Sequence, residues 1–441
     1  MRDVSVQDAR HHIGQDVTIH AWIQNIRNQK SVQFVILRDY TALLQATLEK
    51  SEQNARLNEL VARLTRESVV LVSGTLFENQ KVSLGGIELL IRNLEVLSLA
   101  DETLPIDMSG RTTSSPEKRL DWRFLDLRRP ENQLALRVQT TAEAAMRDFW
   151  LSESFLEIHS PKLMGSPSES GAELFSLEYF GQTAYLAQSP QFYKQMAMAA
   201  GLNRVFEIAP VFRADPSFTS RHATEFTSVD MEMSWINSHL DVMDFEERWL
   251  HHILNTVREK HGEEIRATFG VEVIVPTRRF PKLSMEEAVS ILRAQEHVPP
   301  PDAKPGDIDP QGERILSDYV SATQNHEFVF VIDYPTSVRP FYHMTYENDP
   351  HKTKSFDLLW KGLEITTGAQ REHRYDVLRQ QALDRGLGLE PIQFYLDFFR
   401  YGCPPHGGFG FGLARMLAMM LGQNNIREVT FLHRGPNRLK P

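Results

Sequence analysis

The sequence predicts an α+β protein with two folded parts, a small N-terminal β-barrel and a larger antiparallel sheet flanked by helices. Short segments of alternating polarity dominate residues 1–101, and this alternation is typical of half-buried strands. Further along, strand-like segments outnumber helical ones and connect through hairpins or loops, which favours an antiparallel sheet over a doubly wound parallel one. We therefore expect a barrel at residues 1–101, a linker at 102–131 and a second domain at 132–441.

The composition excludes several classes of protein. The chain has 441 residues, enough for two or three domains, and its 41% hydrophobic and 24% charged content is ordinary for a soluble globular protein. It contains no run of eighteen apolar residues and no signal-peptide pattern at its start, so we expect a cytoplasmic protein with no membrane partner. The single cysteine, Cys403, excludes an internal disulfide and a cysteine-built metal site. The net charge of −10 argues against a protein that coats nucleic acid nonspecifically.

The N-terminal part has the pattern of a five-stranded barrel of the oligonucleotide-binding (OB) type. Residues 17–49 contain three strand-like segments, and a helix is expected over 51–68 with Ser51 as its N-cap. Further strands are expected within residues 68–77, 81–91 and 94–100. A helix inserted after the third strand is typical of OB barrels, although a generic small β-domain remains the alternative. Phe34 and Gln45 could stack on and read an unpaired base, whereas Phe34 could equally be a core residue.

The linker and the second domain follow from local composition and period. Residues 101–131 are rich in Pro, Ser and Thr and show no sustained period, as expected of a linker. Helices are expected at residues 132–152 and 236–262, with two more within 284–325. Later strands and one helix are expected at residues 328–335, 341–349, 355–368, 394–402 and 408–422.

Residues 204–235 are the most informative stretch of the second domain. They are predicted to form two strands joined by a loop of about twelve residues, which is long for a hairpin. One face of this pair carries Arg213, Asp230 and Glu232, and the loop adds Arg221 and His222. Cations that meet a polyphosphate beside carboxylates that meet an amine indicate a site for a nucleotide and an amino acid. A plain amphipathic hairpin is the alternative.

Three motifs in order resemble those of the class II aminoacyl-tRNA synthetases. They are FLEIHSPKL, VFRADPSFTSRHATEFTSVDMEM and GFGFGLARM. Any one of them is weak evidence, since GFGFG alone could be a tight turn or a helix-packing site. Within the class, QSPQFYKQ, TSVDMEM and GLEITTGAQREHRY are similar to the aspartyl enzymes, and the absence of a large insertion before the third motif resembles the compact archaeal type.

The resemblance implies an aspartate–tRNA ligase. Such an enzyme activates L-aspartate with ATP to aspartyl-adenylate and transfers it to the 3′ end of tRNA(Asp), and some members also charge tRNA(Asn). The first motif implies a homodimer. Two alternatives stay open: an asparagine-activating relative or tRNA-independent amide synthetase, and a nonenzymatic tRNA-binding paralogue. Intact Arg213, Glu364 and Arg415 argue against the paralogue.

The resemblance also implies roles for individual residues. Arg213 would hold the α-phosphate and the reacting carboxylate, while Phe226 and Arg415 would sandwich the adenine. Asp215 stands where the family usually has Glu, and its side chain is one methylene shorter, so a contact with the adenine edge would need a bridging water. The implied catalytic residues are Arg213, Glu364 and Arg415. The implied ATP contacts are Arg213, Asp215, Arg221, His222, Ala223, Phe226, Glu364, Gly412, Leu413, Ala414 and Arg415.

The remaining implied roles concern the metal, the amino acid and the anticodon. Mg²⁺ would be held by Glu364 and Thr367, with Asp357 a weaker candidate for a second ion. Lys194 and Arg371 would both meet the side-chain carboxylate of aspartate, and leaving two buried cations opposite a neutral amide would reject asparagine. The implied aspartate contacts are Glu169, Gln191, Lys194, Arg213, Asp230, Thr367 and Arg371, and the implied contacts to the middle anticodon base are Phe34 and Gln45.

Overall fold

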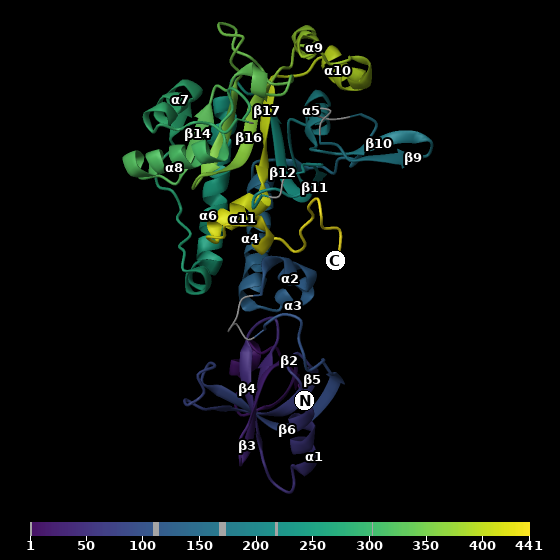
Figure 1. The fold of residues 1–441 in the computed structure, drawn as a ribbon, viewed down its shortest axis with the longest axis vertical. Coiled ribbons are helices and arrows are strands. Elements are labelled where there is room, and N and C mark those ends of the chain that lie inside the picture. The colour runs from purple at the N-terminus through teal and green to yellow at the C-terminus, as the bar shows by residue number, and fades with distance from the viewer. Residues whose placement is uncertain (1, 109–113, 167–172, 217–218, 302) are drawn as a thin grey trace. The chain divides into compact units, whose positions relative to one another are not determined.

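The chain forms two compact units. A computed structural model describes residues 2–108, 114–166, 173–216, 219–301 and 303–441. The units are Met1–Pro130 and Glu131–Pro441, and Figure 1 shows the elements of each. The first unit therefore includes most of the segment predicted to be a linker.

The first unit is built on a closed five-stranded barrel, as predicted. Its strands are β2 (Asp16–Asn28), β3 (Val32–Arg38), β4 (Leu43–Glu49), β5 (Val69–Glu78) and β6 (Ile87–Ser98). They neighbour one another in the order β2-β3-β4-β6-β5, and β5 pairs back with β2, which closes the barrel. Closure leaves no long unpaired edge. The helix α1 (Ala55–Arg63) follows β4, and the N-terminus adds β1 (Arg2–Asp3) and the 3₁₀ helix η1 (Asp8–His12).

Two local predictions in this unit are wrong. The two strands expected at residues 81–91 and 94–100 are one strand, β6, which pairs with β5 along its length. The two strands approach closely at Gly74, where a Cβ would lie 1.9 Å from the Leu90 carbonyl oxygen. The N-cap of α1 is Asn54 and not Ser51, whose hydroxyl instead accepts a bond from the Asn54 N–H.

The linker is also more ordered than its composition indicates. It contains α2 (Pro116–Asp121) and α3 (Arg123–Asp126), each too short to produce a readable period. Arg128 pairs with the buried Glu67 at 2.9 Å, which ties the segment after α3 to the barrel.

The second unit is built on an eight-stranded, mainly antiparallel sheet, which confirms the predicted class. The strand order is β13-β14-β15-β16-β17-β12-β11-β7, and only the end pairs β13–β14 and β11–β7 are parallel. The strands are β7 (Leu156–Glu157), β11 (Arg204–Phe212), β12 (Glu225–Ser234), β13 (Lys282–Ser284), β14 (Phe328–Ile332), β15 (Ser355–Trp360), β16 (Leu363–Arg371) and β17 (His406–Gly412). A small separate sheet contains β8 (Leu163–Met164), β9 (Ser176–Tyr179) and β10 (Gln182–Leu186).

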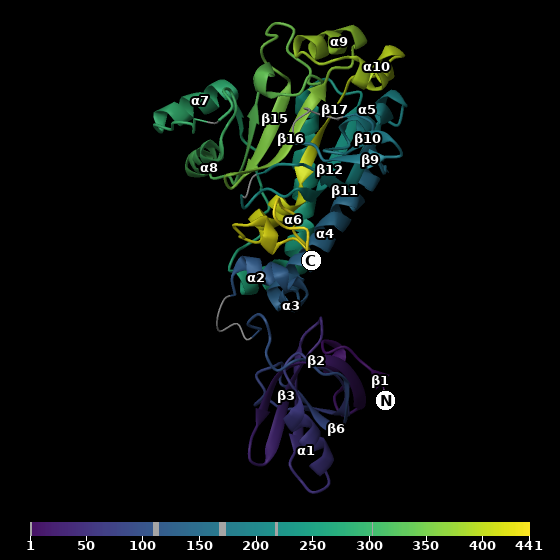
Figure 2. The ribbon, with the colours of Figure 1, turned by 45° about the vertical axis from the view of Figure 1, so that its right-hand side comes forward.

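Helices cover the large sheet and its ends (Figures 1 and 2). Helix α6 packs along β16 and β17, and α11 packs on β12 and β16. The helices are α4 (Pro130–Ser152), α5 (Gln191–Ala199), α6 (His239–Phe269), α7 (Met285–Ala294), α8 (Pro310–Gln324), α9 (Tyr375–Asp384), α10 (Gln393–Arg400) and α11 (Leu413–Met420), with 3₁₀ turns η2 (Thr336–Val338), η3 (Glu390–Ile392) and η4 (Ile426–Glu428). None of the helices in the described part of the chain combines the length and apolar character needed to cross a membrane.

Most predicted elements of this unit are present, with two differences. Helix α6 has the expected cap, Ser238, but continues seven residues past 262 and ends at Gly270, whose φ of +71° suits glycine. Residues 341–349 form no strand.

The core leaves one face of the central strands free for a site. Phe206, Met231 and Phe409 are buried in a cluster with Trp150 and Trp249, and the Trp150 ring stacks on both Phe206 and Trp249, with centroids 4.4 and 4.9 Å apart. Since side chains alternate along a strand, the polar residues of β12 lie on the opposite face, as the sequence predicts.

Candidate active site

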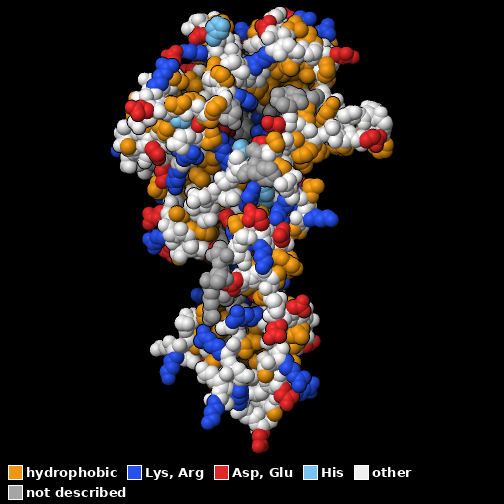
Figure 3. All heavy atoms as spheres, viewed as in Figure 1, with side chains coloured by type: hydrophobic (Ala, Val, Ile, Leu, Met, Phe, Trp, Pro, Cys, Tyr) orange, Lys and Arg blue, Asp and Glu red, His pale blue; other side chains and the backbone are white. Residues whose placement is uncertain are grey.

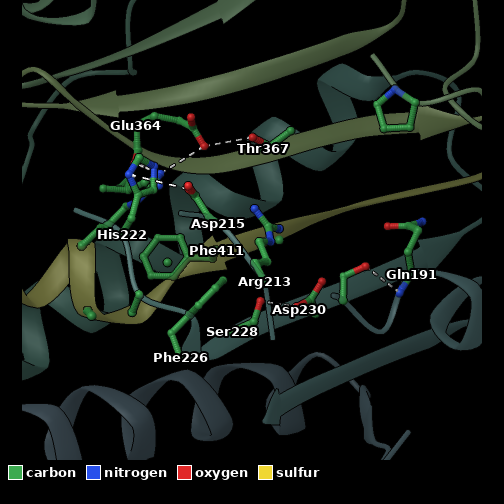
Figure 4. A pocket seen from close by; sticks show the side chains of 18 of the residues that line it. Gln191, Arg213, Asp215, His222, Phe226, Ser228, Asp230, Glu364, Thr367 and Phe411 are labelled. Atoms are coloured by element: carbon green, nitrogen blue, oxygen red, sulfur yellow. Dashed lines mark hydrogen bonds and ion pairs between the residues drawn. The ribbon is translucent and has the colours of Figure 1, made fainter. Parts of the chain in front are cut away.

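A cavity of about 400 Å³ lies in the second unit, on the polar side of β12, β16 and β17. The segment between β11 and β12, the start of α5 and the start of α11 complete its wall (Figure 4). It brings together most of the predicted site residues: Gln191, Lys194, Arg213, Asp215, Arg221, His222, Ala223, Phe226, Asp230, Glu364, Thr367, Arg371, Gly412, Ala414 and Arg415.

Three predicted residues of this site or of the metal are not part of that lining or cannot be placed in it. The side chain of Leu413 packs in the core, because it begins α11 on the inner side of that helix, and it does not line the cavity. Asp357 lies inside β15, buried against Arg339. Glu169 lies outside the described residues, and Glu173 lines the cavity from the described end of the same segment.

The alternation in β17 explains how the cavity reaches the strand backbone. Phe409 packs into the core, Phe411 packs there and also borders the cavity, and Gly410 lies on the cavity side. Gly408 lies on the same face of the strand as Gly410, against Glu232. A Cβ at Gly408 would lie 2.1 Å from the Met231 carbonyl oxygen, so no larger residue fits there. The GFGFG stretch is therefore a strand that leaves room for neighbouring side chains, and not a turn.

One end of the cavity carries an aromatic ring and several cations (Figure 4). The Arg213 guanidinium lies 5.5 Å from the centre of the Phe226 ring. Arg415 donates to the Glu364 carbonyl oxygen at 2.9 Å. Burial together with Arg415 lowers the pKa of His222. Planar cations beside a half-buried ring that lines a cavity are suited to a base and a polyphosphate.

Arg221 is engaged in a different way from the prediction. Its guanidinium pairs with Glu313 of α8 at 2.8 Å, and Glu313 also accepts from the Glu364 N–H at 3.1 Å. Burial, then the nearby Glu364 charge, raises the pKa of Glu313. Arg221 would have to share or leave this partner to meet a phosphate.

Two carboxylates are candidates for holding a metal ion: Glu364, which lines the cavity, and Asp357, which is buried in β15 outside that lining. Thr367 donates its hydroxyl to Glu364 at 3.1 Å. Burial alone would raise the pKa of Glu364, but Arg415, Arg339 and Arg221 together hold it below its usual value. Burial raises the pKa of Asp357, to which the Glu364 charge adds, although Arg339 bonds it at 2.6 Å.

These oxygens fit the hard ligands that Mg²⁺ requires. Within the described ranges, no group of three or more His, Cys, Asp or Glu side chains is placed to hold a metal ion. Glu364 and Thr367 could therefore hold Mg²⁺ only with phosphate or water oxygens completing its shell, and Asp357 would first have to share its carboxylate with Arg339.

The other end of the cavity is a buried ionic cluster formed by Lys194, Asp230, Glu232 and Arg371. Each of these residues is at most 4% exposed. Lys194 lies 3.0 Å from Asp230 and 3.4 Å from Glu232, and Arg371 lies 3.0 Å from Glu232. Glu232 thus bridges the two cations. Burial would raise its pKa, but Arg371 and Lys194 hold it below its usual value, so it stays ionised.

The cluster corrects one part of the sequence interpretation. Lys194 and Arg371 lie in the same cluster, as predicted from the resemblance, but Asp230 and Glu232 already neutralise their charges. The substrate carboxylate is therefore not the sole counter-charge of these two cations. The sequence interpretation noticed Glu232 on the polar face without assigning it a role. It also missed Arg339 and His343, which line the cavity from a segment without regular structure. The available signal was the sequence around them, VRPFYHMTY, in which polar and aromatic residues are concentrated.

Phe34 and Gln45 lie on one face of the first unit's barrel. Phe34 pairs with Thr47, and Ile36 with Gln45, so Phe34 and Gln45 point to the same side. Phe34 is half-buried, and Gln45 donates to Glu88 at 3.2 Å. An aromatic ring beside a fixed amide can stack on a base and read its edge.

Comparison with known proteins agrees with both units. Residues 115–434 match the family described as tRNA synthetases class II (D, K and N), and residues 17–97 match an OB-fold nucleic acid binding domain. The chain is 40% identical to the aspartate--tRNA(Asp) ligase of Pyrococcus horikoshii over 97% of each chain. It is 41% identical to the aspartate--tRNA(Asp/Asn) ligase of Aeropyrum pernix, over 97% of this chain and 96% of that one.

A solved structure gives the same result for the fold. The asparaginyl-tRNA synthetase of Pyrococcus horikoshii complexed with asparaginyl-adenylate matches with a TM-score of 0.91 and 32% identity over all of both chains. The chain belongs to the class II aminoacyl-tRNA synthetases, in the group for aspartate, lysine and asparagine.

Proposed function

We propose that the chain is an aspartate–tRNA ligase, which activates L-aspartate with ATP and transfers it to tRNA(Asp). The observation that carries this proposal is the ionic cluster of Lys194, Asp230, Glu232 and Arg371 at one end of the cavity. Lys194 and Arg371 are donors only, so they suit the two acceptor oxygens of a side-chain carboxylate and oppose the NH₂ of an amide.

Activation needs no protein base, because the α-carboxylate of aspartate is already ionised at neutral pH. The reaction then depends on positioning and on stabilising charge as it develops on the α-phosphate. Arg213 lies between Asp230 and Phe226 (Figure 4), where its guanidinium can bind both the carboxylate and the phosphate. Bound Mg²⁺ supplies neutralisation of phosphate charge. Glu364 and Thr367 would hold it, with Asp357 a weaker candidate for a second ion.

Phe34 and Gln45 are proposed to contact the middle anticodon base. Charges of both signs are interspersed over the face shown in Figure 3, so recognition by a few specific contacts fits better than a broad basic surface. The tRNA substrate makes the cytoplasm the expected location.

A homodimer is proposed from the first motif. Strand β7 ends the large sheet, beyond β11. Leu156 of β7 and Leu151 near the end of α4 are 51% and 60% exposed, and a strand at the end of a sheet with exposed apolar side chains is suited to pairing with a second copy.

The test is ATP–pyrophosphate exchange with aspartate and with asparagine, followed by charging of tRNA(Asp) and tRNA(Asn) transcripts side by side. Exchange with aspartate is the expected result. Exchange with asparagine alone would favour the asparagine-activating alternative, to which the similarity with the asparaginyl enzyme gives weight. Charging of both transcripts would extend the proposal to tRNA(Asn), as the name of the Aeropyrum pernix relative indicates for that protein.

A further inference from the structure

A chain of buried hydrogen bonds runs from β17 to the cavity. It begins at the Pro404 carbonyl oxygen, which lies 2.8 Å from His406 Nδ1. A carbonyl oxygen can only accept, so Nδ1 must carry a proton. The Cys403 sulfur is farther away, at 3.7 Å from the same nitrogen. If Cys403 donated a proton to Nδ1, then Nδ1 and the Pro404 carbonyl oxygen would both be acceptors, and they lie only 2.8 Å apart.

The imidazole of His406 is neutral. It is completely buried, and burial lowers its pKa to about 4, which the Glu232 charge offsets only in part. With the proton on Nδ1, the other nitrogen, Nε2, is an acceptor. It lies 3.0 Å from Gln195 Nε2. Gln195 therefore donates its amide nitrogen to His406 and must present its amide oxygen on the other side.

The Gln195 oxygen accepts two hydrogen bonds. Gln191 Nε2 donates to it at 2.8 Å, and the Tyr395 hydroxyl donates at 2.9 Å. Gln195 is completely buried and Gln191 is 5% exposed, so water has little access to either amide. The direction of every bond then follows from the first one, and each amide has one orientation compatible with it.

The consequence appears at the cavity wall. Because its nitrogen is committed to Gln195, Gln191 presents its amide oxygen to the cavity. Figure 4 shows this oxygen on the side of Arg213 and Asp230, with the nitrogen turned away. An oxygen at this place beside Asp230 accepts a hydrogen bond from an ammonium group, whereas the reversed amide would oppose it with a second donor.

We infer that His406, Gln195 and Tyr395 are positioning residues that fix the amide of Gln191 as an acceptor for the ammonium group of the amino acid. This inference rests on the proposed function, because it takes an amino acid as the ligand. None of the three touches the cavity directly; they act through Gln191, which lines it.

The test is Gln195→Met, which keeps the length of the side chain and removes both of its hydrogen-bonding atoms. In pyrophosphate exchange, the KM for aspartate should rise by about tenfold or more, as expected for a hydrogen bond to a charged group, while the KM for ATP stays unchanged. Succinate has the two carboxylates of aspartate and no ammonium group, so its inhibition constant should also stay unchanged.

A matched control is Gln370→Met, which changes another buried amide in the second unit that does not line the cavity. It should leave all three constants unchanged. If Gln195→Met weakens aspartate and succinate equally, Gln195 has only a structural role and the inference is overturned.

Two further measurements do not depend on the stability of Gln195→Met. Tyr395→Phe removes one donor and keeps the link to His406, so it should raise the KM for aspartate less than Gln195→Met and leave succinate unaffected. In the wild-type protein, ¹⁵N spectra of labelled histidines, assigned by comparison with His406→Asn, should show His406 protonated at Nδ1 only. Protonation at Nε2 reverses the chain and overturns the inference, even if the wild-type protein activates aspartate; absence of activation with the expected tautomer contradicts only the proposed function.

Discussion

Lys194→Met tests the assignment of the ionic cluster most directly. The substitution keeps an unbranched side chain of similar length and removes the ammonium, which lies 3.0 Å from Asp230 and 3.4 Å from Glu232. The cluster then has two carboxylates and one guanidinium, so its net charge changes from zero to −1. The carboxylate of an incoming aspartate loses a cation and meets an excess of negative charge.

The size of the effect follows from the distances. Two unit charges about 4 Å apart interact by roughly 4 kcal/mol at an effective dielectric constant of about 20. Water in the cavity reduces this value, so we expect a loss of about 2–4 kcal/mol, or roughly a 30- to 1,000-fold rise in the KM for aspartate. The KM for ATP should hardly change, because the nucleotide end of the cavity is lined by other residues.

The assay is pyrophosphate exchange with aspartate and ATP varied in turn. Lys162→Met is the matched control, since Lys162 also pairs with a buried carboxylate, Glu207, at 3.1 Å but does not line the cavity. It should leave both constants unchanged. Equal rises in the KM for aspartate and for ATP in Lys194→Met would refute the assignment of Lys194 to the amino acid.

Three other predictions follow from separate parts of the chain. Phe34→Ala should weaken tRNA charging and leave aspartyl-adenylate formation intact; a matching loss of pyrophosphate exchange would contradict a role confined to the anticodon. Glu364→Gln should raise the Mg²⁺ concentration needed for half-maximal exchange by about tenfold or more, because an amide is a poorer ligand for a hard cation; an unchanged Mg²⁺ dependence would remove Glu364 from the metal site. Burial raises the pKa of Glu246 from 4.5 to about 8. The protonated side chain therefore contributes fully to the free energy of unfolding below pH 4.5, and this contribution is lost as the pH rises through about 8. Glu246→Gln should therefore reduce the fall in the free energy of unfolding between about pH 5 and about pH 8, and chemical denaturation that shows the same fall in both proteins would argue against this pKa.

Sequence patterns predicted the parts of the fold that repeat over several residues. The alternation of apolar and polar residues in β12 is visible in the chain, and the strand uses it as expected. The GFGFG stretch alone is equally compatible with a turn or a helix-packing site, so the strand β17 could not be predicted from it. The capping of α6 by Ser238 was equally legible, because a cap is a local hydrogen bond. The linker helices α2 and α3 were not, because six and four residues are too few to show a period.

The partners within the site could not be read from the sequence. Glu232 and Arg371 are 139 residues apart, and Arg221 and Glu313 are 92 apart. Each residue alone is an ordinary charged side chain, and only the sheet order β16-β17-β12 brings Arg371 to Glu232. The resemblance to a family suggested which residues would face the substrate, but it did not show how these residues pair with one another in the folded protein.

That pairing changes the physical basis of selectivity. Two uncompensated cations buried together would destabilise the protein, whereas a cluster with equal numbers of both signs can remain buried and ionised. Aspartate can then bind by exchange of partners: its ammonium group pairs with Asp230, while its side-chain carboxylate pairs with Lys194 and Arg371. Asparagine offers the same ammonium group but an NH₂ in place of one acceptor oxygen, so the exchange leaves a buried donor facing a donor. On this basis, discrimination comes from the mismatch of hydrogen-bonding groups and not from unmet charge, and Glu232 contributes to it by holding both cations in place.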